Sequence, residues 1–451
     1  MLRVTLTAQM VIMHVLLTLR NLKANGFQTL LSLWQIWRSR SEGTPVLSEI
    51  WKELISTSTK SWLWHQRLSH LNFDTINDLA RNDLVTGLPK FKYHKEHLCP
   101  SCEQGKSKRA SHPPKPVPNS KKRLHLLHMD LCGPMRIASI NGKRYVLVIV
   151  DDYSRYTWVH FLRSKDEAPE VIKTFLKRIT VLLQAPVIIV RTDNGTEFKN
   201  QVLQEYFNSV GISHQTSSVR TPQQNGVVER RNRTLVEAAR TMLIFSRAPL
   251  FLWAEAIATA CYTQNCSIIH RRFNKTPYEL INGRKPDISF LHVFGALCYP
   301  KNDREDIRKL GAKCDIGFFI GYSADSCAYR VYNRRTKKIM ETMNVTFDEL
   351  SAMAFEQSSS KPELQSMTSG QISSGLNLTY APSTITAQKP TEGDLDLLFE
   401  AMYDDHIGAY TALTPINSSS QATNILNTTQ DVDELETQQQ HVQQQDNEAS
   451  L

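Results

Sequence analysis

A nearly continuous apolar run at residues 144–151, RYVLVIVD, limits the folds open to this chain more than any other segment. A strand that is apolar on both faces lies inside a sheet whose two faces are both covered. Residues 156–162 also have strand composition, and the short link between the two runs predicts a hairpin. Residues 165–183 then carry apolar side chains at three- and four-residue steps, which predicts a helix that Pro186 ends. This order indicates an α/β sheet covered by helices.

Strands and helices continue to alternate around this hairpin. The sequence predicts strands at residues 124–130, 187–190 and 212–216, and helices at residues 197–210 and 227–243. In mixed α/β sheets of this kind, ligands gather near the carboxyl ends of the central strands.

Three acids occupy positions from which they can converge on that edge. Asp130 ends the first strand, Asp193 lies just beyond the strand at 187–190, and Glu229 is in the first turn of the last helix. The helix dipole favours an acid in that turn, and its side chain can still point toward the sheet. Acids are common, so their spacing alone is weak support. Converging carboxylates are nevertheless the ligands that hold two Mg²⁺ or Mn²⁺ ions about 3.5–4 Å apart for phosphoryl transfer.

The residues around these acids resemble the integrases of copia-type LTR retrotransposons. The matching stretches are DDYSRY at 151–156, RTDNGTEF at 191–198 and TPQQNGVVER at 221–230. The resemblance implies a ribonuclease-H-like catalytic core over roughly residues 124–243. In that family two aspartates and a distal glutamate form the metal-binding catalytic triad. The matching positions here are Asp130, Asp193 and Glu229.

Other acids in these motifs are weaker candidates for metal ligands. Asp151 and Asp152 are expected to end a strand or to cap the hairpin turn. Glu197 falls in the first turn of the helix predicted at 197–210, where an acid more often acts as a cap.

Polar and basic residues beside Glu229 are candidate contacts to DNA. For Arg233, four residues after Glu229, an ion pair with that acid is the alternative interpretation. The candidate DNA contacts are Gln223, Gln224, Asn225, Arg230, Arg231 and Arg233.

Two pairs of residues upstream predict a zinc site. His65 and His70 form a His-x4-His pair, and Cys99 and Cys102 form a Cys-x2-Cys pair that starts 29 residues later. A tetrahedral Zn²⁺ ion accepts both kinds of ligand, whereas a redox motif and ordinary core histidines are the alternatives. The set resembles the amino-terminal zinc domain of integrases, in which Zn²⁺ is structural. We therefore expect zinc binding to supply much of the folding energy of this domain.

A β-rich segment follows the core. A helix predicted at 250–269 leads to short strands, and the predicted strands are at 293–300, 314–322, 329–332 and 338–347. The segment resembles the small SH3-like barrel that follows integrase cores.

The charge of the chain changes sign near residue 350. Residues 1–350 hold 51 basic and 30 acidic side chains, a net charge of +21, and residues 351–451 hold 2 and 14, a net charge of −12. The basic part suits a phosphate-rich partner. The acidic part is rich in Ser, Thr, Gln and Asn, which predicts a largely disordered segment. For its apolar-acidic island at 395–403 we expect a solvated, nascent helix, and docking to a partner is the alternative.

Six cysteines outside the zinc set are scattered singly, which favours a reducing compartment over secretion, and no apolar run is long enough to span a membrane. The predicted organisation is an unassigned segment at 1–45, a zinc domain at 46–112, an integrase core at 118–285, an SH3-like domain at 286–350 and a disordered tail at 351–451.

The resemblance implies Mg²⁺- or Mn²⁺-dependent 3′-end processing and strand transfer, which join element ends to target DNA. It further implies a homo-oligomer on DNA, in the nucleus with a cytoplasmic particle stage, and the acidic tail offers a site for a protein partner. The alternative is a catalytically silent or host-adopted factor that binds DNA or chromatin and derives from an integrase fragment.

Overall fold

The computed structural model describes residues 59–95, 97–107, 120–217, 225–301, 314–324, 326–349, 385–386 and 390–402. The segment at 1–45, the candidate DNA contacts Gln223 and Gln224, and most of the tail lie outside these residues. Within the described ranges, no helix is long and apolar enough to cross a membrane.

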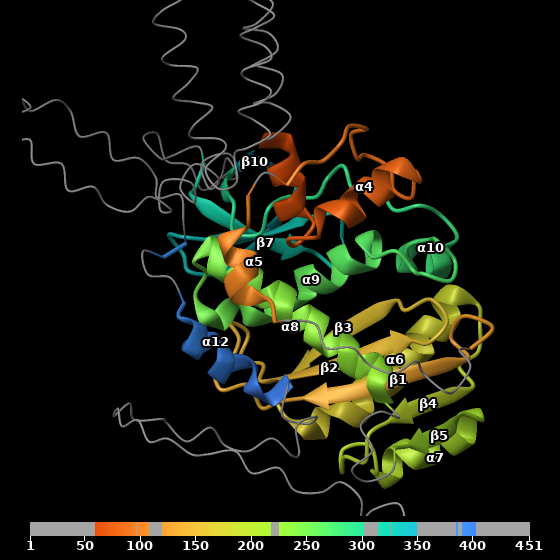
Figure 1. Ribbon diagram of the computed structural model, residues 1–451. Coiled ribbons are helices and arrows are strands. Elements are labelled where there is room, and N and C mark those ends of the chain that lie inside the picture. The colour runs from red at the N-terminus through yellow and green to blue at the C-terminus, as the bar shows by residue number, and fades with distance from the viewer. Residues whose placement is uncertain are drawn as a thin grey trace, which may run out of the picture. The chain divides into compact units, whose positions relative to one another are not determined.

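Five strands form the first sheet, in the order β3-β2-β1-β4-β5 (Figure 1). The strands are β1 Leu126–Cys132, β2 Tyr145–Asp151, β3 Thr157–Leu162, β4 Ile189–Thr192 and β5 Ser213–Thr216. β1, β2 and β3 pair antiparallel, whereas β4 and β5 continue the sheet parallel to β1. The predicted hairpin and the predicted mixed sheet are both confirmed.

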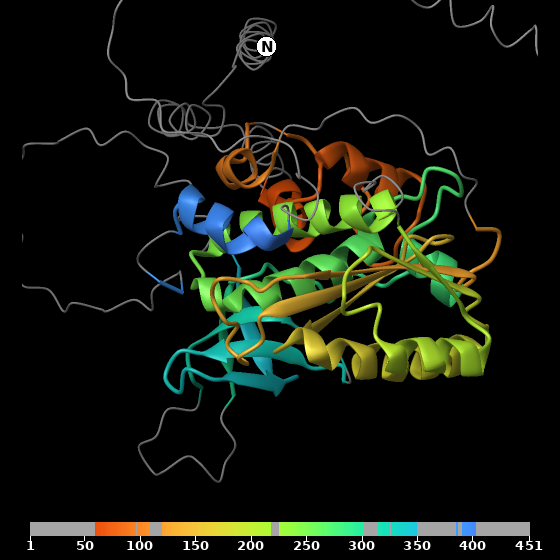
Figure 2. The ribbon, with the colours of Figure 1, turned by 90° about the horizontal axis from the view of Figure 1, so that it is seen from below.

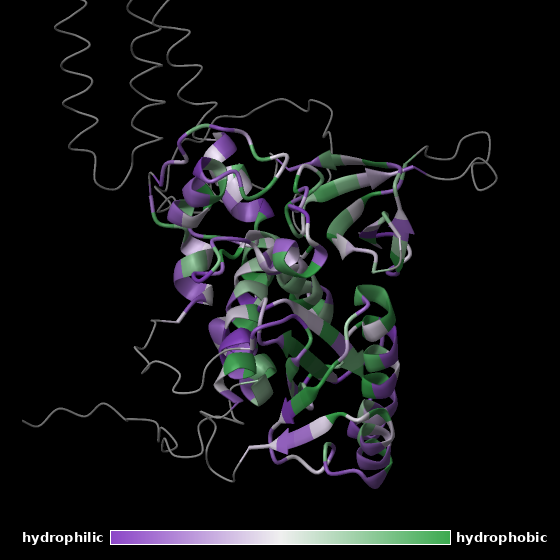
Figure 3. Cartoon of the chain, turned by 90° about the vertical axis from the view of Figure 1, so that its right-hand side faces the viewer, coloured by the Kyte–Doolittle hydropathy of each residue, from purple (hydrophilic) through white to green (hydrophobic). Residues whose placement is uncertain are grey.

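The apolar run in β2 is buried on both faces, as predicted. Val146, Val148 and Val150 belong to one apolar cluster, and Leu147 and Ile149 belong to another on the opposite face. The helices that contribute to the first cluster are α8 Gly226–Ser246, η3 Leu250–Leu252 and α9 Trp253–Ser267. The helices on the other face are α6 Ala168–Leu183, preceded by η1 Lys165–Glu167, and α7 Gln201–Val210. Figure 2 shows the sheet between α6 on one side and α8 with α9 on the other, and hydrophobic residues colour its central strands in Figure 3.

The boundary of β1 differs from the prediction in a way that matters for the site. The strand runs on to Cys132, so Asp130 lies inside it, opposite Val148 of β2, and is not its last residue. The apolar residues after Asp130 extend the buried strand past the acid. Asp130 is consequently 1% exposed.

The start of α7 also differs from the prediction. Asn200 accepts a hydrogen bond at 2.8 Å from the Val202 N–H, an N-cap that begins the helix at Gln201. Glu197 therefore precedes the helix, and its predicted role in the first turn is wrong. Its carboxylate lies 3.7 Å from Lys165 Nζ.

A second sheet has the order β10-β6-β7-β8-β9, with all neighbours antiparallel. Its strands are β6 Leu297–Pro300, β7 Gly317–Tyr322, β8 Tyr329–Asn333, β9 Ile339–Thr342 and β10 Val345–Asp348. The single strand predicted at 338–347 is thus two strands at opposite edges of the sheet. The sheet packs on α9, where Thr259 Oγ1 donates a 3.0 Å hydrogen bond to the Ile320 carbonyl. Between α9 and this sheet the chain forms α10 Pro277–Asn282.

The amino-terminal module consists of a helix at 59–67, α4 Phe73–Arg81 and α5 Pro100–Gly105. It packs on the core helices: a Cβ added at Gly105 of α5 would lie 2.5 Å from Thr241 Oγ1 of α8, so only glycine permits this approach. Ser69 Oγ and Thr263 Oγ1 of α9 are 2.7 Å apart. An ion pair between Arg67 and Glu349 joins the module to the end of the second sheet.

Part of the tail is ordered, contrary to the prediction of disorder. α12 Glu392–Phe399 and η5 Glu400–Met402 lie beside α8 (Figure 2). The side chains of Leu395, Leu398 and Phe399 are buried in the same apolar cluster as the core of α8, and Asp396 pairs with Arg240 of that helix. The apolar-acidic island is therefore not a solvated helix; its apolar face has a partner within this chain.

Candidate functional site

The four predicted zinc ligands converge. One ligand atom from each of His65, His70, Cys99 and Cys102 lies within 4.8 Å of the other three, and among the described residues this is the one such group found. His65 Nε2 is 3.2 Å from His70 Nδ1, and each histidine has a cysteine Sγ at 3.5 Å. Local structure explains the arrangement, because Cys99 is the N-cap of α5 and Cys102 lies in its first turn.

Neighbouring groups orient these side chains toward a common centre. His65 Nδ1 lies 2.7 Å from the Leu71 carbonyl, so an Nδ1–H donated there leaves Nε2 with a lone pair facing the cluster. Burial lowers the pKa of His70 to about 4, which keeps its ring neutral. Hydrogen bonds from Cys99 and the two histidines hold the pKa of the Cys102 thiol well below its ordinary range. Neutral imidazole and thiolate are the states in which these residues bind Zn²⁺.

The register of β1 and β4, extended past the end of β4 at Thr192, indicates that Asp193 lies level with Asp130. β1 and β4 are parallel, and their partners Leu126↔Ile189 and His128↔Arg191 differ by 63 positions. Asp130 and Asp193 also differ by 63 positions, so continuing the register beyond Thr192 brings them side by side. Residues level on adjacent parallel strands point to the same face of a sheet.

A hydrogen bond ties Asp130 to the helix that carries Glu229. Asn232 Nδ2 of α8 donates to Asp130 Oδ2 at 2.6 Å and also lies 3.2 Å from Cys132 Sγ. Glu229 is three residues before Asn232, and residues three apart share one face of a helix. Glu229 therefore lies on the face of α8 that is turned toward β1. Its Oε2 folds back over the helix start, 3.8 Å from the position of a Cβ at Gly226.

These relations indicate one common region for the three acids, but their carboxylate oxygens are not close together. Among the described residues, the His/Cys group is the one set of three or more potential ligands close enough to hold a metal ion, so Asp130, Asp193 and Glu229 do not form a closed cluster. Carboxylates repel one another, and a cation between them is what would draw them together.

The structure gives the two rival aspartates other tasks. Asp151 accepts hydrogen bonds from the Leu124 N–H at 2.8 Å and from Ser154 Oγ at 2.6 Å. Burial raises the pKa of Asp151. Asp152 accepts from Arg155 NH1 at 3.0 Å and lies 3.1 Å from His128 Nε2. Both aspartates hold the turn between β2 and β3, in agreement with the prediction.

The candidate DNA contacts separate by exposure. Arg230 and Arg233 are exposed on α8, whereas Arg231 is 8% exposed and bonds to the protein itself. Asn225 is 3% exposed; its Nδ2 donates to the Met129 carbonyl at 3.2 Å, and its Oδ1 lies 3.3 Å from His128 Nδ1. The prediction of a DNA contact at Asn225 does not fit this burial, because both amide atoms join α8 to β1.

Sequence reasoning missed Asn232. The available signal was its position three residues after Glu229, on the face of the helix that carries the acid. A polar residue at that spacing was an identifiable partner for a carboxylate, but the strand opposite it was not known.

Three family models match this chain. The integrase core domain matches residues 120–222, the GAG-pre-integrase domain matches residues 45–107, and the retroviral polymerase SH3-like domain matches residues 296–362. The retrovirus-related Pol polyprotein from transposon TNT 1-94 of Nicotiana tabacum is 33% identical over 290 residues, which are 64% of this chain and 21% of that protein. Residues 45–362 of this chain are thus similar to the integrase region of retrotransposon Pol polyproteins.

Other relatives of this integrase region show the same partial coverage. The Pol polyprotein from transposon RE1 of Arabidopsis thaliana is 32% identical over 63% of this chain and 19% of its own length. The Ty1-DR6 Gag-Pol polyprotein of Saccharomyces cerevisiae is 28% identical over 64% of this chain and 17% of its own length. The chain thus spans about a fifth of the length of the curated relatives it matches.

Solved integrases also align with this integrase region. The HTLV-2 integrase catalytic core domain in complex with magnesium is 25% identical, with a TM-score of 0.28, over 36% of this chain and 98% of that chain. The integrase-type catalytic core with a mixed α/β sheet and the SH3-like domain are confirmed as the fold class.

Proposed function

We propose that this chain joins element DNA to target DNA by metal-dependent 3′-end processing and strand transfer. The observation that carries the proposal is the β1/β4 register, which supports a position of Asp193 beside Asp130. The Asn232–Asp130 hydrogen bond supports an approach of Glu229 to Asp130 from α8. The match to the integrase core domain supports the same reaction class.

Asp130, Asp193 and Glu229 would hold the divalent ions. Their donors are all carboxylate oxygens, which suit Mg²⁺ or Mn²⁺ and not softer metals. Bound there, such ions lower the energy of charge that develops on a phosphodiester in an in-line displacement. Burial of Asp130 on the sheet keeps that carboxylate in a fixed orientation, and Asn232 holds one of its oxygens.

The His65, His70, Cys99 and Cys102 cluster would hold a structural Zn²⁺ ion. Its two nitrogens and two sulfurs match a closed tetrahedral site, which leaves no position for a reacting water. Because α5 packs on α8, the helix that carries Glu229, ordering of this module supports the catalytic region mechanically.

DNA would be the partner on both sides of the reaction, as element ends and as target. Arg230 and Arg233 supply exposed positive charge next to Glu229, and contacts of this kind position a duplex without reading its sequence. Strand transfer at two element ends calls for more than one copy of the active site, so we expect a homo-oligomer on DNA. Its place of action would be the nucleus, where target DNA is found.

A strand-transfer assay tests the proposal. The full chain is incubated with duplexes that carry the terminal-repeat ends of its element, with target DNA and with Mg²⁺ or Mn²⁺. Asp193→Asn is expected to reduce joined products by about 100-fold or more, since a lost metal ligand removes several kcal/mol of transition-state stabilisation. The matched control is Asp166→Asn, an exposed acid at the start of the α6 region, which should keep wild-type yield. DNA binding without joined products in the wild-type chain would favour a silent binding factor instead.

A further inference from the structure

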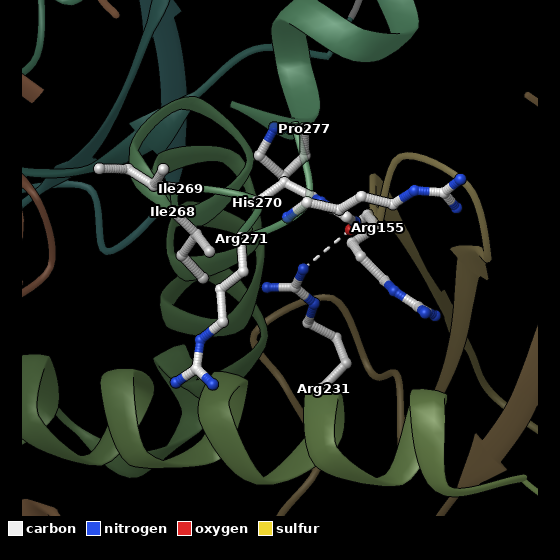
Figure 4. Close-up of a pocket in the computed structure, with 8 residues that line it drawn as sticks. Arg155, Arg231, Ile268, Ile269, His270, Arg271 and Pro277 are labelled. Carbon is white, nitrogen blue, oxygen red and sulfur yellow. Dashed lines mark hydrogen bonds between the residues drawn. The ribbon is translucent and has the colours of Figure 1, made fainter. Parts of the chain in front are cut away.

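A cationic pocket of about 320 Å³ lies beside α8 (Figure 4). None of the three acids Asp130, Asp193 and Glu229 is among its described lining residues. Its volume falls at the lower end of the range for ligand sites, roughly 300–1,000 Å³. Its polar lining comes from the turn between β2 and β3, from α8 and from the loop after α9, and no acid is among the described residues that line it. The polar lining residues are Arg155, Arg231, His270, Arg271 and Arg272.

Arg231 brings a buried positive charge to this pocket. It is 8% exposed, NH2 donates to the Arg155 carbonyl at 2.8 Å, and NH1 donates to Gln264 Oε1 at 3.2 Å. Both acceptors are neutral, and no carboxylate of the described residues forms an ion pair with this guanidinium. Burial lowers the pKa of Arg231 to about 10, so it stays charged at neutral pH. A buried charge without a counter-ion is unfavourable, and an anion in the pocket would offset that penalty.

The rim of the pocket is held in place before any ligand arrives. His270 closes a tight turn, because its N–H donates to the Lys275 carbonyl at 2.9 Å and its Nδ1 accepts from the Arg272 N–H at 3.2 Å. The rings of Tyr153 and Phe273 are 4.9 Å apart and join this turn to the β2–β3 turn. A rim that is already ordered loses little entropy on binding.

The positive charge of the lining is larger than the one ion pair between Arg155 and Asp152 neutralises. Asp152, which is not among the lining residues, pairs with Arg155 at 3.0 Å. Arg271 and Arg272 are exposed on the turn, and burial, reinforced by Arg155, lowers the pKa of His270, which leaves that ring neutral. Arg231, Arg271 and Arg272 therefore line the pocket, and no carboxylate is among its described lining residues. Guanidinium forks match the oxygens of phosphate in bidentate geometry.

We propose that this pocket binds one phosphate of the DNA backbone. The inference rests on the proposed function for its ligand. The pocket is close to the catalytic acids: Arg231 is two residues after Glu229 on α8. Residues two apart on a helix do not face the same side, so the bound phosphate flanks the reacting one and is not the one attacked.

The variant Arg271→Gln/Arg272→Gln tests the proposal in the full chain. The matched control, Arg163→Gln/Arg284→Gln, removes the same charge from exposed arginines outside the pocket. Affinity for a fluorescein-labelled 30-base-pair duplex is measured by anisotropy over a series of salt concentrations. Loss of one phosphate contact should lower the magnitude of the slope of log K against log[salt] by about 0.9 in the pocket variant. Equal slopes for the pocket variant and the control would overturn the proposal.

Two further experiments distinguish DNA phosphate from free phosphate as the ligand, and the phosphate site from the proposed reaction. Sodium phosphate at matched ionic strength, compared with chloride, should raise the Tm of the wild type and not that of the pocket variant. If the variant loses this effect but keeps the wild-type salt slope on DNA, the pocket takes free phosphate and the DNA assignment fails. Strand transfer is assayed on the wild type in parallel. A shifted slope without joined products would refute the proposed reaction and leave the phosphate site standing.

Discussion

Replacing Glu349 should destabilise the contact between the amino-terminal module, the residues before β6 and the end of the second sheet. Glu349 is 8% exposed and pairs with Arg67 of the amino-terminal module. It also accepts the Val293 N–H at 2.9 Å and lies 3.2 Å from His292 Nδ1. Glu349→Gln removes the charge while nearly keeping the volume. It therefore tests electrostatics and not packing.

The magnitude follows from the pKa of Glu349. Burial alone would raise that pKa, but hydrogen bonds from His292 and Arg67 outweigh burial and lower the pKa from 4.5 to about 2. At 1.36 kcal/mol per pKa unit the shift corresponds to roughly 3 kcal/mol of stability. Because the folded pKa is depressed, this contribution is complete above about pH 5 and is lost as pH falls toward 2.

Urea unfolding of the full chain, followed by circular dichroism at fixed zinc activity, measures the effect. Glu349→Gln should lose about 2–3 kcal/mol at pH 7, and the difference from wild type should shrink steadily between pH 5 and pH 2. Glu341→Gln, an exposed acid paired with Arg330, should lose less than about 1 kcal/mol. Equal losses for the two variants, or a Glu349→Gln effect that does not depend on pH, would refute this reasoning.

Three further predictions follow from single contacts. Cys99→Ser should release zinc from the purified chain and melt the amino-terminal module, as read by metal analysis and by hydrogen exchange; retention of one zinc per chain would disprove the ligand set. Leu398→Ala, at a buried position of α12, should lower the free energy of opening of that helix by about 2–5 kcal/mol and so speed its hydrogen exchange. Leu397→Ala, at a position that is 47% exposed, should change this exchange little. Asn232→Leu should lower strand transfer about tenfold or more with DNA affinity unchanged, because the hydrogen bond to the charged Asp130 is worth roughly 1.5–3 kcal/mol; unchanged transfer would remove Asn232 from the site.

Local pattern predicted the elements of the core because burial acts on each strand separately. β2 is apolar at successive positions because both of its faces are buried, and α6 is apolar at three- and four-residue steps because one of its faces is buried. The His/Cys pairs were also predictable, since ligand type and spacing suffice to name them. Their convergence is a property of the fold that the structure adds.

Features that depend on contacts between distant segments were not predictable. The island at 395–403 carries acidic residues and a short apolar stripe, and nothing in its own sequence reveals the surface of α8 that buries Leu398. Asn225 looked like a free polar loop residue, but its amide bridges α8 and β1. The break of the strand predicted at 338–347 arises because β9 and β10 pair with different neighbours.

Mn²⁺ binding, followed by electron paramagnetic resonance on the DNA-bound chain, tests most directly whether the three acids share one metal centre. The account predicts that Asp130→Asn, Asp193→Asn and Glu229→Gln each weaken Mn²⁺ binding by about tenfold or more, with Asp166→Asn equal to wild type. Unchanged Mn²⁺ affinity in any of the three would contradict the assignment of that acid, and unchanged affinity in all three would contradict the proposed catalytic site.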